Sequence, residues 1–439
     1  MSDNTVTHRQ VWRIAGPMII ANISTPLLGM VDTAMVGHLS AAHYLGAVAI
    51  GSMIFTFVFW GFGFLRMATT GLTSQAYGEN STVKMQAVLM QSIWLALTIA
   101  ALLLLIQLPI RNLALHLVSS SQDVEYFAAV YFDIRIWSAP ATLINYAILG
   151  WLIGREASKA ALLMVLVINI TNILLDALFV MGLGMDVDGV ALASVIAEYS
   201  GLLIGLLLLK HYGLNKAGIR LSLSKKVLQQ SRHGLHVHGN VMIRTFLLIS
   251  CFALFTTQGA RQGDTVLAAN SVLLNFITFM AFVLDGFANA TEALTGKAIG
   301  RKSPVMLKKA LEVTTFWSVL MAALFSLTYW LFGEQIIRLL TGIDAVIEFA
   351  GMHLIWVIIA PLVAVWSYLL DGLFVGATRS REMRNTMLFS AFCCYLPAFY
   401  LLQPFGNHGL WAALIIFLAA RGISQSVYIG KIMRLADPT

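Results

Sequence analysis

The sequence predicts an all-α integral membrane protein with twelve transmembrane helices in two pseudo-symmetric lobes of six helices each. Three observations lead to this prediction: an apolar composition, apolar runs of spanning length, and an internal repeat. Of the 439 residues, 59% are hydrophobic and 11% are charged, whereas a soluble domain carries about 25% charged residues. At roughly 20 residues per span, a chain of this length has room for about twelve spans. Continuous apolar runs exclude an outer-membrane barrel, in which polar and apolar residues alternate.

The predicted helices follow apolar runs separated by short polar segments. Six belong to an N-terminal lobe at residues 1–210, and six belong to a C-terminal lobe at residues 236–439, with a polar cytoplasmic linker at 211–235. The expected helices cover residues 11–37, 44–70, 87–109, 127–151, 160–182, 188–210, 236–258, 266–291, 309–332, 350–376, 386–404 and 408–430.

The basic residues are distributed unevenly between the two sides of the membrane. If the N-terminus lies in the cytoplasm, 21 of the 28 lysines and arginines fall in cytoplasmic segments and 3 fall on the opposite side. This positive-inside bias predicts a multi-pass protein of the bacterial inner membrane with both termini in the cytoplasm. It also accounts for the net charge of +7 without a nucleic-acid partner.

An internal repeat supports the division into two lobes. The segment GLTSQAYGEN at 71–80 aligns with ALTGKAIGRK at 293–302. Because each lobe has an even number of predicted helices, both lobes enter the membrane in the same direction. Parallel repeats of this kind suit alternating access, in which two lobes rock around a path between them.

The N-terminal lobe carries acidic and amide side chains inside its predicted spans. Asp32 lies in the first predicted helix together with Pro17, and it aligns with an apolar residue in the second copy of the repeat. In the fifth predicted helix, Asn169, Asn172 and Asp176 fall at i, i+3 and i+7, which is one helical face. An ionised side chain in the hydrocarbon is costly and commonly marks an ion or substrate pathway.

The sixth predicted helix adds Ser194 and Glu198 at i and i+4, again on one face. Amide and hydroxyl groups in membrane helices often only join neighbouring helices. We therefore expect Asp32 and Asp176 to bind the coupling ion, with Asn172, Ser194 and Glu198 as further members of the site. The same oxygen atoms suit a proton or a sodium ion, and the sequence does not choose between them.

The C-terminal lobe also has charged residues within its predicted spans. They are Arg244, Asp285, Asp371 and Arg421. Opposite charges in one helical bundle commonly pair with one another, so we interpret these residues as structural ion pairs. A second ion or substrate site is the alternative interpretation.

Motifs of other functional classes are absent from the sequence. It contains no GxSxG, HExxH or Walker motif. We therefore expect neither an enzyme nor a pump driven by ATP, and we expect no cofactor other than the coupling ion.

Several long segments together resemble one transporter family. They read PMIIANISTPLLGMVDTAMVGHL, YLGAVAIG, GLTSQAYG and LLDGLFVGATRSREMRN. From about Val11 to the last helix, the chain is similar to the multidrug and toxic compound extrusion (MATE) family, and more narrowly to its bacterial DinF branch. The resemblance implies a V-shaped arrangement of two six-helix lobes. It also implies antiport of cationic amphipathic drugs against inward protons or sodium ions.

Carried over by position, the resemblance implies an ion site in the N-terminal lobe, on Asp32, Asn172, Asp176 and Ser194. These four residues would be the ligands of a sodium ion if the transporter is coupled to sodium. Tyr131 in the fourth predicted helix is also implied, and Pro17 matches the point at which the first helix bends. The other major branch has acidic residues in its C-terminal lobe, but Asp371 lacks an acidic partner in the seventh helix, which favours the N-terminal site.

The resulting hypothesis is a monomeric antiporter for cationic amphipathic small molecules, in contact with membrane lipids. An ion that neutralises Asp32 and Asp176 would remove their attraction for a cationic drug, and bending at Pro17 would release the drug outward. Three alternatives stay open: a flippase for a lipid or a lipid-linked precursor from a related exporter family, a membrane-embedded enzyme, and an uncoupled channel.

Overall fold

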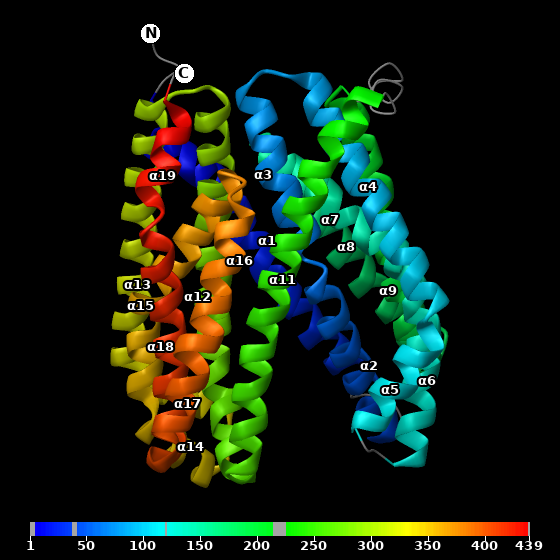
Figure 1. Ribbon diagram of the computed structural model, residues 1–439. Helices are drawn as coiled ribbons and strands as arrows, with labels where there is room; N and C mark the ends of the chain where they lie inside the picture. The colour runs from blue at the N-terminus through cyan, green and yellow to red at the C-terminus, as the bar shows by residue number, and fades with distance from the viewer. Residues whose placement is uncertain (1–4, 37–41, 119–120, 214–224, 438–439) are drawn as a thin grey trace. The chain divides into compact units, whose positions relative to one another are not determined.

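The computed structural model describes almost nothing but helices. It covers residues 5–36, 42–118, 121–213 and 225–437, with side chains described except at 27, 28, 30–36, 42, 117, 118 and 225–232. No strand occurs in these ranges (Figure 1). Hydrocarbon offers no hydrogen-bond partners, so an apolar chain must satisfy its backbone N–H and C=O groups within helices. The predicted all-α membrane fold is confirmed.

Ten helical stretches in the described ranges are long and apolar enough to cross a membrane. They are His43–Gly78, Thr82–Leu105, Gln122–Gly154, Ser158–Gly182, Val187–His211, His233–Arg261, Asp264–Gly300, Pro304–Leu340, Leu354–Gly376 and Ser380–Ser426. The stretch Ser380–Ser426 is 47 residues long and covers the predicted span 386–404 and most of the predicted span 408–430. The predicted total of twelve spans therefore stays a prediction.

The chain folds into two compact units, each assembled from separate parts of the sequence. The N unit contains Ile20–Thr73 and Ser81–Gly234, and the C unit contains Met1–Ile19, Ser74–Asn80 and Leu235–Thr439. Three helices contribute residues to both units: α1 (His8–Val36), α3 (Phe64–Gly78) and α11 (Lys225–Arg261). The lobe boundaries expected from the sequence stay a prediction.

The N unit is a bundle in which sequence neighbours and distant helices pack together. Its further elements are α2 (Ala42–Gly61), α4 (Thr82–Leu105), α5 (Gln107–Val118), α6 (Gln122–Arg135), η1 (Ile136–Ser138), α7 (Ala139–Gly154), α8 (Ser158–Asp176), η2 (Ala177–Gly182) and α9 (Val187–His211). Helix α8 packs on α9, α4 on α7, and α2 on α6. The close approach of α7 to α3 depends on Gly150, because a Cβ atom at this position would collide with the carbonyl oxygen of Arg66 on α3.

The C unit is built around α12 (Asp264–Gly300) and α15 (Leu354–Gly376), which pack side by side (Figure 1). Its further elements are α13 (Pro304–Leu340), α14 (Asp344–Met352), α16 (Ser380–Leu388), η3 (Phe389–Tyr395), α17 (Leu396–Leu402), η4 (Gln403–Phe405), α18 (Gly406–Ser426), α19 (Ile429–Met433) and η5 (Arg434–Ala436). A Cβ atom at Gly376 would lie 2.5 Å from the carbonyl oxygen of Glu292, and one at Gly372 would lie 2.6 Å from that of Ala288. Small residues four apart thus let these two backbones touch, as is typical of membrane helices.

Several helices extend beyond the predicted apolar runs. Helix α12 continues to Gly300, and α11 begins at Lys225, inside the predicted linker. Hydropathy reports where side chains meet hydrocarbon, but a helix continues into water until a breaker or an end cap stops it. The ends of these helices were therefore predicted less well than their centres.

Candidate ion and substrate site

The polar face of α8 is the centre of the candidate site. Asn169, Asn172 and Asp176 are all buried, whereas Ile170 and Leu174 on the same helix are exposed. The predicted i, i+3, i+7 face is thus the face that packs inside the N unit. Asp176 is 0% exposed, so its carboxylate does not reach the surface of the protein.

Two hydrogen bonds organise this face. Asn172 donates from Nδ2 to Oδ2 of Asp176 at 2.9 Å, and Asn169 donates from Nδ2 to Oγ of Ser24 at 2.8 Å. Ser24 lies on α1, so Asn169 joins α8 to the helix that also carries Asp32. Asn169 therefore acts as a link between helices, while Asn172 supports the carboxylate directly.

Asp176 is the last residue of α8 and is followed at once by a π-helical segment, η2. A π-helical turn widens the backbone and weakens the regular ladder of hydrogen bonds, and such turns are frequent at functional sites. The carboxylate therefore stands at a place where the helix is locally irregular rather than in a uniform rod.

Ser194 is buried on α9, the helix that packs against α8. No hydrogen bond joins its hydroxyl to Asn172 or Asp176 in the described part of the chain.

Asp32 belongs to α1, but its side chain lies outside the described residues. Helix α1 continues through Pro17 from His8 to Val36, so the bend expected at this proline stays a prediction.

Glu198 of α9 is hydrogen-bonded to α7, and not to Asn172 or Asp176 of α8. Asn145 of α7 donates from Nδ2 to Oε2 of Glu198 at 2.9 Å and to its backbone oxygen at 3.0 Å. Glu198, Arg66 and Arg135 all lie within electrostatic range of Tyr146. Asn145 is not among the site residues expected from the sequence. The signal that the sequence offered was a single asparagine within an apolar run.

Tyr131 packs between α6 and α2. Its ring fills the space beside Gly51, where a Cβ atom would collide with it, and its hydroxyl lies 3.3 Å from Oγ of Ser52. Within the described residues, no hydrogen bond joins Tyr131 to Asn172 or Asp176. Its role in ion coupling stays a prediction.

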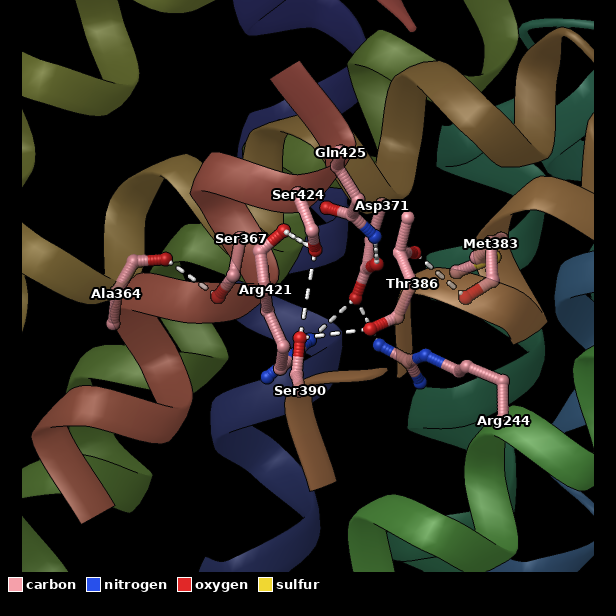
Figure 2. Close-up of polar contacts among 10 residues, drawn as sticks. All are labelled: Arg244, Ala364, Ser367, Asp371, Met383, Thr386, Ser390, Arg421, Ser424 and Gln425. Carbon is pink, nitrogen blue, oxygen red and sulfur yellow. Dashed lines mark hydrogen bonds and ion pairs between the residues drawn. The ribbon is translucent and has the colours of Figure 1, made fainter. Parts of the chain in front are cut away.

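Three of the four charged residues predicted within the spans of the C-terminal lobe, Arg244, Asp371 and Arg421, form one buried cluster (Figure 2). Arg244 of α11 and Arg421 of α18 both donate from Nη2 to Oδ2 of Asp371 on α15, at 2.6 Å for Arg421. Gln425, one turn beyond Arg421, donates from Nε2 to Oδ1 of Asp371 at 2.6 Å. The expected ion pairing is present, and it occupies both oxygens of the carboxylate. Asp371 is thus engaged by two guanidinium groups and one amide, whereas the side-chain hydrogen bond described for Asp176 comes from the amide of Asn172.

The oxygen atoms of Asp176 and Asn172 on α8 and of Ser194 on α9 are of the types that bind a hard cation. Among the described residues, no group of three or more His, Cys, Asp or Glu side chains lies close enough to hold a metal ion. Carboxylate, amide and hydroxyl oxygens from Asp176, Asn172 and Ser194 are nevertheless the ligand types that a sodium ion would use, and the same carboxylate would accept a proton. Either ion would neutralise a buried charge whose desolvation is costly.

Comparison with known proteins places these features in context. A family model described as MatE matches residues 17–178 and 241–401. The chain is 45% identical over 421 residues to DNA damage-inducible protein F of Escherichia coli (strain K12), covering 96% of this chain and 91% of that protein. It is 24% identical over 442 residues to Multidrug resistance protein NorM of Vibrio vulnificus (strain YJ016), covering 97% of this chain and 95% of that protein.

Solved structures share the fold at lower sequence identity. An outward-facing multidrug resistance MATE family transporter of the MOP superfamily superposes with a TM-score of 0.87 at 18% identity, over 98% of this chain and 97% of that one. The Vibrio cholerae MATE transporter VcmN in its bent form superposes with a TM-score of 0.85 at 21% identity, over 98% of both chains.

Proposed function

This chain belongs to the MATE family, and from that premise we propose that it is a secondary active antiporter that exports cationic amphipathic compounds in exchange for protons or sodium ions. Membership rests on the family model, which matches both halves of the chain, and on the 45% identity to DNA damage-inducible protein F. Members of the family are membrane transporters that couple to ions and need no cofactor, so the chain is a transporter and not an enzyme.

The observation that carries the proposal is the buried pair formed by Asn172 and Asp176. The amide of Asn172 holds one carboxylate oxygen at 2.9 Å, which fixes the orientation of the acid within the N unit. A carboxylate in this position attracts a cation, and taking up a proton or a sodium ion cancels that attraction. The site therefore has two states, one that favours an organic cation and one that does not.

The proposed cycle uses these two states in order. With the site ionised, the organic cation binds in the N unit. The coupling ion then neutralises Asp176 and Asp32, and bending of α1 at Pro17 narrows the space so that the drug leaves outward. Shifting a two-state equilibrium from one side to the other takes about 5.5 kcal/mol. A single modest interaction does not supply this, so we propose that both carboxylates and the drug are coupled.

Efflux from everted membrane vesicles tests the proposal. Ethidium serves as the organic cation, and a proton gradient or a sodium gradient is imposed separately to identify the coupling ion. Asp176→Asn keeps the size of the side chain and one oxygen that can accept from Asn172, but it removes the charge, so ion-driven efflux should fall to background. Asp133→Asn is the matched control, because Asp133 pairs with Arg111 at 2.6 Å and its side chain is 45% exposed.

Unchanged ethidium efflux in Asp176→Asn, with expression equal to that of the unaltered protein, would show that the mechanism is wrong.

We further propose that the protein works as a monomer in the inner membrane with both termini in the cytoplasm. If proteoliposomes that contain the purified protein moved a fluorescent lipid analogue but no ethidium, the flippase alternative would replace the proposal.

A further inference from the structure

The cluster around Asp371 in the C unit holds more positive than negative charge. It consists of Arg244, Asp371, Arg421 and Gln425, and none of these residues is more than 6% exposed. Two guanidinium groups contact one carboxylate, which gives these four residues a formal charge of +1. A buried charge without a counter-charge is far more costly than one at the surface.

The hydrogen bonds of the cluster show the same imbalance. Each guanidinium has five N–H donors, and a carboxylate can only accept. Oδ2 of Asp371 accepts from both arginines and Oδ1 accepts from Gln425 (Figure 2). In the described part of the chain, Nε of Arg244, Nε of Arg421 and Oε1 of Gln425 are buried and have no hydrogen-bond partner. The cluster therefore has unused buried donors.

The neighbouring side chains do not supply the missing acceptor. Thr386, Ser390 and Ser424 donate their hydroxyl groups to backbone oxygens of their own helical segments. Asp285 of α12 lies within electrostatic range of Tyr368, but the ion pairs of both arginines, in the ranges that the structure describes, are made with Asp371. One further acceptor with a single negative charge would balance the cluster.

We propose that this cluster binds the carboxylate group of an amphipathic organic compound. Asp371 is the internal model for such a ligand, because it shows that a carboxylate fits between the two guanidinium groups. Arginine presents a planar fork that matches a carboxylate better than a spherical ion. The ring of Phe417 lies 5.7 Å from the guanidinium carbon of Arg421 and offers an apolar contact for the body of the compound.

The inference rests on the proposed function, since it adds carboxylate-bearing amphipathic compounds to the cations that the transporter exports. Asp371 competes with the ligand for the arginines. When a ligand binds, it shares or takes over their donors, and when it leaves, Asp371 recovers them. This internal competition keeps binding reversible, as transport requires.

The experiment compares two probes of the same shape and different charge: naphthalene-1-acetate and its neutral amide, naphthalene-1-acetamide. Binding to the full-length protein in lipid nanodiscs is measured by calorimetry. We expect the acetate to bind about tenfold more tightly than the amide. Arg421→Gln should weaken acetate binding by about tenfold, and Asp371→Asn should strengthen it by a similar factor because the internal competitor is lost. Amide binding should be the same in both variants.

A purely structural cluster gives the opposite result for Asp371→Asn, since a damaged fold does not bind an anion more tightly. If Asp371→Asn does not fold, Gln425→Leu removes the donor to Oδ1, loosens Asp371 and should still strengthen acetate binding. Equal binding of acetate and amide would overturn the proposal, as would unchanged acetate affinity in Arg421→Gln. Binding of sodium chloride in the absence of acetate binding would overturn the assignment to a carboxylate.

The same assays separate this inference from the proposed function. Asp176→Asn lies in the N unit and should abolish ethidium efflux without changing acetate binding. If Asp176→Asn retains ethidium efflux, the proposed function fails whatever the acetate result. If acetate binding does not depend on Arg421 while Asp176→Asn abolishes efflux, only the carboxylate site fails.

Discussion

The imbalance of charge around Asp371 predicts that its removal costs more stability than the removal of one of its arginines. Asp371→Asn leaves two buried guanidinium groups without a carboxylate, and uncompensated buried charge of this kind costs about 3–5 kcal/mol. Arg244→Gln leaves Asp371 paired with Arg421 at 2.6 Å and hydrogen-bonded to Gln425 at 2.6 Å. It removes one charged hydrogen bond, which costs about 1.5–3 kcal/mol, and it also relieves repulsion between the two arginines. The expected cost of Arg244→Gln is therefore at the lower end of that range.

Thermal unfolding in one detergent measures both variants. Because membrane proteins often unfold irreversibly, the apparent midpoints are compared at one fixed scan rate. Asp133→Asn is the matched control: its ion pair with Arg111 has side chains that are 45% and 25% exposed, so its loss should cost about 0–1 kcal/mol. If Arg244→Gln lowers the midpoint as much as Asp371→Asn does, the reasoning about excess positive charge is wrong.

Three further predictions concern packing, pH and topology. Gly376→Ala places a Cβ atom 2.5 Å from the carbonyl oxygen of Glu292 and should destabilise the protein by about 1–3 kcal/mol. A Cβ atom at Gly351 would meet no neighbouring atom within 4 Å, so Gly351→Ala should be neutral or stabilising in the same unfolding assay. Equal effects of the two variants would refute the role given to Gly376. Burial lowers the pKa of His353 below its ordinary value of 6.5, so the unfolded chain binds more protons at this residue than the folded chain does. The contribution of His353 to stability should therefore be intact above pH 6.5 and should be lost as the pH falls through the lowered pKa. If the unfolding midpoint of His353→Gln falls with decreasing pH as much as that of the unaltered protein, this prediction is contradicted. In a background without the native cysteines, Gly342→Cys should react with a membrane-impermeant maleimide in intact cells and Asp437→Cys only after permeabilisation, and the reverse pattern would overturn the proposed orientation.

The approximate positions of most long apolar helices could be predicted because hydropathy depends on each residue and its immediate neighbours. Helix ends were harder to predict. Helix α13 runs from Pro304 to Leu340, well beyond the apolar run at 309–332, because residues outside the hydrocarbon can continue a helix in water. The start of α11 at Lys225 has the same explanation. Polar composition indicates exposure to water and does not by itself indicate the end of a helix.

Part of the candidate site could be predicted for a similar reason. Asn172 and Asp176 are four residues apart on one helix, and residues at that spacing are neighbours whatever the rest of the fold does. Their hydrogen bond is the local result. The pairing of Glu198 with Asn145 joins α9 to α7, and that of Tyr131 with Ser52 joins α6 to α2. These pairings depend on which helices lie side by side, and no spacing in the sequence encodes them.

The sequence alone determined the class of protein, the approximate spans and the family, because composition, hydropathy and long motifs are carried by neighbouring residues. The tertiary structure decided which charges meet. Arg244, Asp371 and Arg421 are far apart in the chain and come together only when α11, α15 and α18 pack. Ionic and hydrogen-bonding interactions act over a few ångströms, so the balance of charge in the C unit depends on helix packing, and only the folded protein shows that one carboxylate faces two arginines.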